Sequence, residues 1–392
     1  MRNLIIASSL LALSAQVAAE EIKLGIILGF TGPIESLTPG MAAGAELALS
    51  EASKSGNFLG GNTLVAIRGD STCTDVAAAS SVAERLVTSD GVAAIIGGDC
   101  SEVTAAIARN VAVPNGVVMI SPYATAPALS GIDDKGYFFR TAASDARQGQ
   151  VLADILIGRG IDEVAVTYAN NDYGKGLSDS FSNAYKSSGG SISVIAAHET
   201  GNSDYSEEVS ALSASGSRYL AVFAYGDQGG RGIIQASIDA DAFENFILSD
   251  AMVDDSLLAT MGDSLEGSIA TVPGGASGAD AFIGYAKIMG LTGNAPFVAE
   301  FYDAAALIVL AMQAAGSADR AALQSKMMLV ANAPGKKIGP GDLDKALKII
   351  AAGGDVDYQG ATNVEFDGAG EVLGSYTELE INNGKWNTIK IH

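Results

Sequence analysis

The chain has 392 residues, of which 48% are hydrophobic and 17% charged. At roughly 150 residues per domain this length suggests two domains, and so much apolar material excludes disorder as the overall state. The net charge of −22 disfavours nucleic acid and anionic membranes as partners, and the two histidines and two cysteines argue against a metal centre, so we expect no cofactor.

The first 19 residues have the pattern of a cleaved signal peptide. An apolar run from Leu4 to Ala15 has the length of a signal-peptide core, and small residues precede a cleavage site after Ala19. The alternative is a first buried strand or helix. The mature chain would begin at Glu20 with a net charge of −23, because Arg2 is removed. No cysteine follows the cut for lipid attachment, and no later apolar run of about 18 residues lacks charged or turn-forming residues. We therefore expect a soluble protein exported to the periplasm.

The mature chain begins with alternating strands and helices. Short apolar runs predict strands, and the segments of 10 to 15 residues between them have helical patterns. The predicted strands are 22–28, 63–70, 92–97 and 116–121, and the predicted helices are 40–53, 75–88 and 102–110. Such βαβ units build a parallel sheet.

The alternation restarts after residues 138–142 and continues to residue 249. The predicted helices here are 147–158, 173–187, 207–214 and 230–240, and the predicted strands are 163–169, 191–197, 219–225 and 245–249. Beyond them we predict a strand-like segment at 267–273, helices at 279–289, 298–315, 320–329 and 342–352, and strands at 363–366 and 371–381. No Pro-rich or Ser-rich linker divides the chain, which favours two lobes between which the chain crosses more than once.

Cys73 and Cys100 are the only cysteines. Because the periplasm is oxidising, we predict a disulfide between them, and the loop-entropy model assigns a loop of this size roughly 3 kcal/mol of stabilisation. The alternative is a pair of free buried thiols.

Motifs of catalysis are absent from the sequence. It contains no G-x-S-x-G elbow, no phosphate-binding P-loop, no H-E-x-x-H and no G-x-G-x-x-G. The segment from Tyr173 to Gly176 resembles a phosphate loop in composition but has the wrong spacing, and His198 has no second histidine beside it. Nothing activates a nucleophile, so we expect a protein that is not an enzyme.

Polar groups instead follow the predicted strands. Ser101 follows the strand that ends near Gly98, and the segment from Ser121 to Pro127 follows the next strand. Tyr173 and Asp250 follow two strands of the second half. Ligands of open α/β sheets bind outside the carboxyl ends of the strands. Ser101 is also a candidate helix cap, and the other side chains are candidate turn or packing residues.

Several segments resemble the periplasmic solute-binding proteins of ABC importers, specifically the leucine/isoleucine/valine-binding (type I) family. The matching stretches span essentially the whole mature chain: residues 22–33, the Cys73 and Cys100 pair, and residues 119–127, 139–142, 171–177 and 367–370. The resemblance implies an α/β fold of two Rossmann-like lobes with parallel sheets, joined by a hinge of three crossovers. It assigns residues 20–140 and 273–359 to lobe 1 and residues 141–272 and 360–392 to lobe 2, with candidate hinges near Arg140, Pro273 and Gly360.

The resemblance also assigns a ligand site. Ser101, Tyr123, Ala124 and Thr125 match the lobe 1 segments that hold the carboxylate and ammonium of an amino acid. Tyr173, Tyr225 and Asp250 match those of lobe 2, where the family commonly has an acidic residue facing the ammonium. Two positions depart from the family: Tyr123 stands where a small residue is usual, and Leu37 lies where an aromatic wall is frequent.

These implications point to a monomeric periplasmic protein that captures an amino acid, branched-chain or related, and delivers it to an ABC permease in the inner membrane. Three alternatives stay open. They are a ligand-sensing protein of the same fold, a binder of a small carboxylate or amide that is not an amino acid, and a secreted α/β enzyme.

Overall fold

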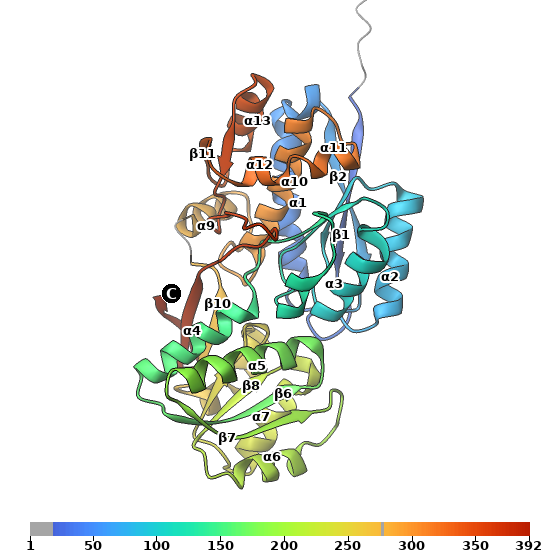
Figure 1. The fold of residues 1–392 in the computed structure, drawn as a ribbon. Coiled ribbons are helices and arrows are strands. Elements are labelled where there is room, and N and C mark those ends of the chain that lie inside the picture. Colours follow the sequence, from blue (N-terminus) through green and yellow to red (C-terminus); the bar gives the residue numbers. More distant parts are fainter. Residues whose placement is uncertain (1–18, 276–277) are drawn as a thin grey trace, which may run out of the picture.

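The computed structural model describes residues 19–275 and 278–392, which form two lobes stacked end to end (Figure 1). The predicted signal-peptide core lies outside the described residues. Each lobe has a sheet with helices packed against it, and the predicted two-lobed α/β fold is confirmed.

The first lobe is built on a five-stranded parallel sheet. Its strands, in the order β2-β1-β3-β4-β5, are β2 (Thr63–Asp70), β1 (Glu21–Leu28), β3 (Ala94–Gly97), β4 (Val118–Ser121) and β5 (Phe138–Arg140). The central strands β3 and β4 are buried along their whole length, as expected for a parallel sheet covered by helices on both faces.

Eight helices belong to the first lobe: α1 (Thr38–Ser55), α2 (Val76–Arg85), α3 (Ser101–Ile107), α9 (Ala279–Ile288), α10 (Val298–Ala315), α11 (Arg320–Gln324), α12 (Met327–Ala331) and α13 (Leu343–Ala351). Among the described residues α10 alone is long and apolar enough to cross a membrane, and 78% of it is buried, so it serves as a core helix. It packs along α1, where a Cβ on Gly44 would lie 2.4 Å from the carbonyl oxygen of Val298. Only glycine permits this approach.

The second lobe is built on a seven-stranded mixed sheet. In the order β14-β13-β10-β9-β8-β6-β7, its strands are β14 (Lys385–Ile391), β13 (Tyr376–Asn382), β10 (Ile269–Pro273), β9 (Asn245–Leu248), β8 (Tyr219–Phe223), β6 (Glu163–Ala169) and β7 (Ser191–His198). β13 runs antiparallel to both β10 and β14, and the other pairs are parallel. The helices are α4 (Asp145–Gly158), α5 (Asp172–Ser187), α6 (Ser206–Ser213), α7 (Arg231–Asp239) and α8 (Asp255–Met261).

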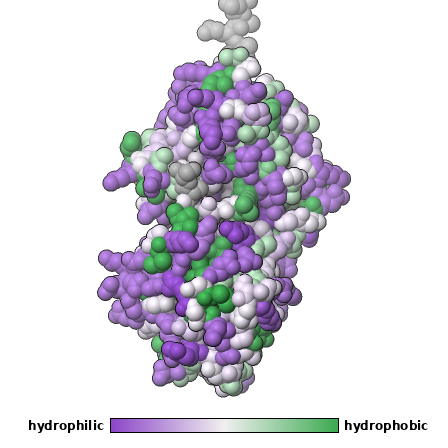
Figure 2. All heavy atoms as spheres, turned by 60° about the vertical axis from the view of Figure 1, so that its left-hand side comes forward, coloured by the Kyte–Doolittle hydropathy of each residue, from purple (hydrophilic) through white to green (hydrophobic). Residues whose placement is uncertain are grey.

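The chain passes between the two main sheets three times: after β5, after β10, and between β12 (Val356–Tyr358) and β13. β12 pairs with β11 (Lys336–Ile338) in a separate two-stranded sheet. The lobe limits given above remain predictions. The face shown in Figure 2 is mostly hydrophilic, in keeping with the strong negative charge, and small hydrophobic patches interrupt it.

Three predictions of secondary structure near the carboxyl end were wrong, and three strands were missed. The strand predicted at 363–366 is absent: residues 360–363 form a turn, the φ of 58° at Asn363 is incompatible with a strand, and Phe366 makes only an isolated bridge to Val372. The strand predicted from residue 371 begins at Tyr376. The helix predicted at 320–329 is two short helices, α11 and α12. The strands β11, β12 and β14 were not predicted.

Candidate functional site

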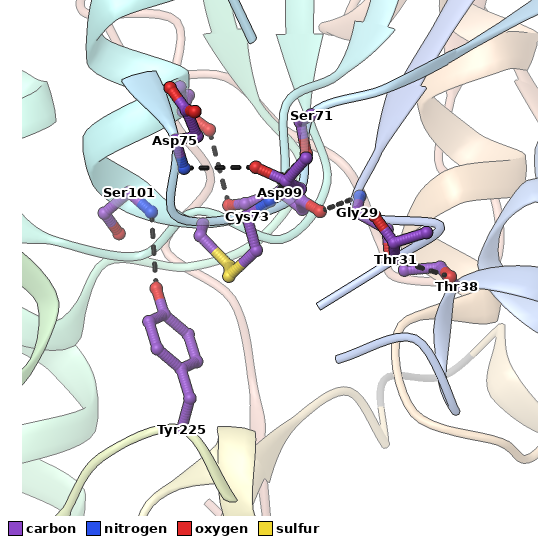
Figure 3. The surroundings of a disulfide bond; sticks show 12 residues. Gly29, Thr31, Thr38, Ser71, Cys73, Asp75, Asp99, Ser101 and Tyr225 are labelled. Atoms are coloured by element: carbon purple, nitrogen blue, oxygen red, sulfur yellow. Dashed lines mark hydrogen bonds between the residues drawn. A yellow bond between two sulfur atoms is a disulfide. The ribbon is translucent and has the colours of Figure 1, made fainter. Parts of the chain in front are cut away.

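The site lies between the lobes, beyond the carboxyl ends of strands from both sheets. The backbone N–H of Ser101, in lobe 1, donates a hydrogen bond of 3.3 Å to the hydroxyl oxygen of Tyr225, in lobe 2. Figure 3 shows the Tyr225 side chain reaching from the second lobe toward Ser101, next to the disulfide. Because this contact is buried, the structure shows the lobes closed on each other.

The lobe 1 wall begins at the disulfide. Cys73 and Cys100 are bonded, which confirms the predicted pairing. The bond links the loop after β2 to the start of α3. The alternative that Ser101 caps this helix is wrong, because Cys100 is the residue that precedes α3 and Ser101 is the first residue of the helix. The Ser101 hydroxyl oxygen accepts from the backbone N–H of Ala126 at 3.3 Å and so faces the second loop of the wall.

Asp99 supports this corner and was missed in the sequence. Its carboxylate is fully buried and accepts from the backbone N–H of Gly29 and, at 2.9 Å, from the hydroxyl of Ser71. Burial raises the pKa of Asp99, and the two hydrogen bonds oppose that rise. Figure 3 places Asp99 beside the disulfide, so it joins the loops that carry Cys73 and Ser101. In the sequence, an aspartate that follows a strand looks the same whether it supports a binding site, as Asp99 does, or forms an ordinary turn.

The loop after β4 forms the second part of the lobe 1 wall. Two hydrogen bonds fix the backbone of this loop. The N–H of Ala124 donates to the hydroxyl oxygen of Ser121 at 3.0 Å, and the carbonyl oxygen of Ala124 accepts from the guanidinium of Arg140, on β5, at 3.3 Å. Thr125, next in the chain, is almost fully buried. Tyr123 packs its ring against Phe297, with centroids 4.5 Å apart, and its buried hydroxyl has no partner among the described residues. The two rings therefore form an aromatic pair beside this loop.

The lobe 2 wall depends on a close approach at the start of α5. A Cβ on Gly174 would lie 2.5 Å from the carbonyl oxygen of Ala169 and 2.8 Å from that of Phe223. Glycine therefore lets the first turn of α5 rest on the ends of β6 and β8. This places Tyr173 against Tyr225, and the two rings stack at 4.7 Å with an interplanar angle of 21°.

Asp250 follows β9 and faces these tyrosines. The hydroxyl of Tyr173 donates to its Oδ1 at 2.6 Å. Burial raises the pKa of Asp250, while the Tyr173 hydrogen bond acts to lower it. Within residues 19–275 and 278–392, no lysine or arginine forms an ion pair with Asp250, and the nearby Arg231 pairs with Asp254 at 2.9 Å. The carboxylate is thus a buried acceptor without a cationic partner.

Leu37 lies where the two lobes meet. It lines a small hollow that also includes Arg231 and Asp254 of the second lobe. In the same region the hydroxyl of Ser36 donates to Asp254 at 3.2 Å, a second contact between lobes.

Sequence reasoning also missed Asp145 and Gln148, on the first turn of α4. Asp145 is completely buried, and its N–H donates to the carbonyl oxygen of Thr125 at 2.9 Å. Gln148 donates from Nε2 to the hydroxyl and carbonyl oxygens of Thr271, at 3.0 and 3.2 Å. The structure therefore brings the predicted Ser101, Thr125, Tyr173, Tyr225 and Asp250 to one place and adds a second carboxylate to it.

Comparisons with known proteins agree with this architecture. A family model described as periplasmic binding protein matches residues 21–335. The leucine-, isoleucine-, valine-, threonine- and alanine-binding protein of Pseudomonas aeruginosa is 29% identical over 78% of this chain and 82% of its own length.

Two solved structures share the fold. The branched-chain amino acid transporter substrate-binding protein LivJ from Streptococcus pneumoniae, in complex with isoleucine, has a TM-score of 0.78 at 20% identity, covering 95% of this chain and 99% of that one. A solute-binding protein of an ABC transporter from R. palustris, in complex with 4-hydroxybenzoate, has a TM-score of 0.77 at 18% identity, covering 95% of this chain and 97% of that one. With two lobes, three crossings and a polar site enclosed where they meet, this chain belongs to the periplasmic binding protein family.

Proposed function

We propose that this protein is the periplasmic substrate-binding component of an ABC importer, and that it binds a free α-amino acid between its lobes and delivers it to a membrane permease. The observation that carries the proposal is the buried carboxylate of Asp250, which has a tyrosine donor but no cationic partner in the part of the chain that the structure describes. A buried charge is costly unless it is paired, and the ammonium of an amino acid supplies the missing charge.

The opposite wall suits the other end of such a ligand. Ser101 and Thr125 supply hydroxyls for a carboxylate, and Tyr173 and Tyr225 shield the ammonium from water. The head group would then touch both lobes, so binding stabilises the closed form. The role includes no reaction, and we propose a monomer that acts alone until it docks on the permease.

One observation favours a different ligand class. Tyr123, in the loop that carries Thr125, packs its ring against Phe297, and one structure of this fold was solved with 4-hydroxybenzoate. An aromatic carboxylate without an amine would leave Asp250 unpaired, so we place it second.

A thermal-shift screen of the mature protein tests both ligand classes. The panel contains the twenty amino acids, their des-amino acids, aromatic acids and amides. A ligand at 100 times its dissociation constant stabilises the folded state by about 2.7 kcal/mol. We expect stabilisation by one group of amino acids and none by the matching des-amino acids. Stabilisation by 4-hydroxybenzoate or benzoate alone would replace the proposed ligand with the second class. Permease and ATPase genes next to this gene would favour transport over ligand sensing.

A further inference from the structure

Asp145 is a buried carboxylate that the proposed function does not yet use. It is the first residue of α4, a position where an acidic side chain normally faces water beside the helix end. Here the side chain is 0% exposed, and neither Oδ1 nor Oδ2 has a hydrogen-bond partner among the described residues. The hydroxyl of Thr125 lies close enough to lower the pKa of Asp145 but forms no well-aligned hydrogen bond with it.

A third unpaired acceptor lies on the same face of α4. Gln148 is three residues after Asp145, so the two side chains are neighbours on the helix surface. Its Nε2 is held by Thr271, which leaves Oε1 buried without a donor. A buried acceptor without a donor costs about 1–3 kcal/mol, so three of them in one place indicate a donor that the described residues do not provide.

These acceptors lie close to Asp250. Both carboxylates are buried, and the charge of Asp250 raises the pKa of Asp145 further above its usual range, after the larger effect of burial. The amide of Gln148 lies near Asp250 as well and helps to lower the pKa of that carboxyl. Asp145 is tied to lobe 1 through Thr125, and Asp250 to Tyr173 in lobe 2.

Among the described residues no cation forms an ion pair with either aspartate, and the charge of Arg140 lowers the pKa of Asp145 only in opposition to the larger effect of burial. The guanidinium of Arg140 is engaged by Glu371 and by the carbonyl oxygens of Ala124 and Ala126. Neither Arg140 nor Arg147 forms an ion pair with either aspartate within the described residues. The ionisable groups around the pair are Arg140 from β5, Arg147 from α4, Tyr173 from α5, Tyr225 from the β8 loop and Tyr376 from β13.

We propose that Asp145 is a second ligand-binding carboxylate, which together with Asp250 and the amide oxygen of Gln148 accepts the three N–H donors of a primary ammonium. The inference rests on the proposed function and narrows its ligand class. The ligand carries a primary amine rather than an N-methylated one, because each methyl group removes a donor and leaves one of the three acceptors unpaired. The ammonium binds in this way only when both carboxylates are ionised.

This arrangement sets the direction of the pH dependence. Protons compete with the ammonium for the two carboxylates, whose pKa values are raised, so affinity falls as the pH is lowered through their titration. Asp145→Asn removes the carboxyl whose pKa is raised further of the two, so only Asp250 still titrates and the loss of affinity on acidification moves to lower pH.

Calorimetric titration of the full mature protein tests the inference. The probes are L-leucine, L-alanine and L-threonine, each beside its N-methyl derivative, with 3-methylbutan-1-amine and 4-methylpentanoate as the amine and carboxylate halves of leucine. The variants are Asp145→Asn and, as a matched control, Asp154→Asn on the same helix, where the exposed carboxylate contacts only Gln150.

For each probe amino acid that binds, we expect Asp145→Asn to weaken binding 10- to 100-fold at pH 7.5 and Asp154→Asn to leave it unchanged. The wild type should prefer the primary amine over its N-methyl derivative, and this preference should be smaller in Asp145→Asn. The loss of affinity between pH 7.5 and pH 5.5 should also be smaller in Asp145→Asn than in the wild type. A merely structural role would change neither the preference nor the pH profile.

The outcomes separate the two proposals. If an amino acid binds but Asp145→Asn changes neither its affinity, the N-methyl preference nor the pH profile, the inference is wrong and the proposed function stands. If 3-methylbutan-1-amine binds without any amino acid and Asp145→Asn weakens it, the inference stands and the amino-acid function is wrong. Binding of 4-methylpentanoate alone, or of no probe, overturns both.

Discussion

Gly176 of α5 lies directly against Pro127 of the opposite lobe: a Cβ at residue 176 would be 2.8 Å from the proline Cδ. The contact joins the helix that carries Tyr173 to the loop that carries Thr125, so it forms only when the lobes are closed. A side chain here would act as a wedge between the lobes without entering the core of either one.

Gly176→Ala should therefore weaken ligand binding while leaving the lobes intact. Overpacking costs about 1–3 kcal/mol, which corresponds to about 5- to 150-fold in affinity. In the ligand-free protein the same change should raise the melting temperature slightly, because alanine favours a helix interior over glycine by about 1 kcal/mol. Gly158→Ala, at the end of α4 with no atoms within 4 Å of the added Cβ, is the control. Unchanged affinity in Gly176→Ala would argue against closure as the structure shows it.

Removing the Asp250 carboxylate should have the largest effect on binding. Asp250→Ala leaves a buried ammonium unpaired, at a cost of about 2–5 kcal/mol. Asp250→Asn should cost less, because the amide oxygen still accepts one hydrogen bond. Without ligand, neither change should lower the unfolding free energy much, since a buried carboxylate without a cation does little for stability. Calorimetry and urea unfolding on the same samples separate the two effects, and intact affinity in Asp250→Ala would mean that the ligand has no ammonium at this position.

The disulfide should stabilise the protein and shape the site together. Replacing Cys73 and Cys100 by serine should lower the unfolding free energy by roughly 3–4 kcal/mol, from the entropy of a loop of this length. Binding should also weaken, because Cys100 precedes Ser101 at the start of α3. Thiol labelling of the unfolded, non-reduced wild type should find no free thiol. Two labelled cysteines per chain would show that the bond is absent in the isolated protein.

The alternation of strands and helices was predictable because each parallel strand is a short, continuous apolar run between turn residues. The strands that were missed lack this signal. β11 begins with two exposed lysines, Lys336 and Lys337, and β14 exposes most of its side chains, so neither has a hydrophobic pattern. These strands form through pairing with β12 and β13, which the local sequence does not encode.

The same distinction applies to the site. Ser101, Tyr173 and Asp250 could be singled out because each follows a predicted strand, where ligands of parallel sheets bind. Asp145 could not, because Ser144 and Asp145 together resemble any ordinary helix start. Its burial comes from the crossing after β5, which lays α4 against Thr125 and Asp250. This long-range arrangement becomes visible only in the folded chain.

Glu300 should make stability depend on pH where the crossings meet. It lies in the first turn of α10, and its carbonyl accepts from the hydroxyl of Thr141 at 3.0 Å, while Asp303 one turn later accepts from Tyr358 and Thr362. Burial, with a smaller contribution from the charge of Asp303, raises the pKa of Glu300 from 4.5 to about 8. The folded state then holds a proton that the unfolded state has lost between those two pH values, so the unfolding free energy falls as the pH rises through this window.

Urea unfolding at pH 6.5 and at pH 8 measures this effect. The interval avoids the titration of His198, whose pKa is lowered to about 4 and whose contribution to the unfolding free energy changes with pH in the opposite direction. Glu300 should contribute a decrease of about 2 kcal/mol across this interval, since each pH unit is worth about 1.4 kcal/mol. Glu300→Gln imitates the protonated side chain, so the variant should lose that part of the decrease and be more stable than the wild type at pH 8. Glu84→Gln, an exposed position on α2, should follow the wild type. Equal slopes for Glu300→Gln and the wild type would mean that Glu300 is ionised in the folded protein and that the crossings carry a buried charge.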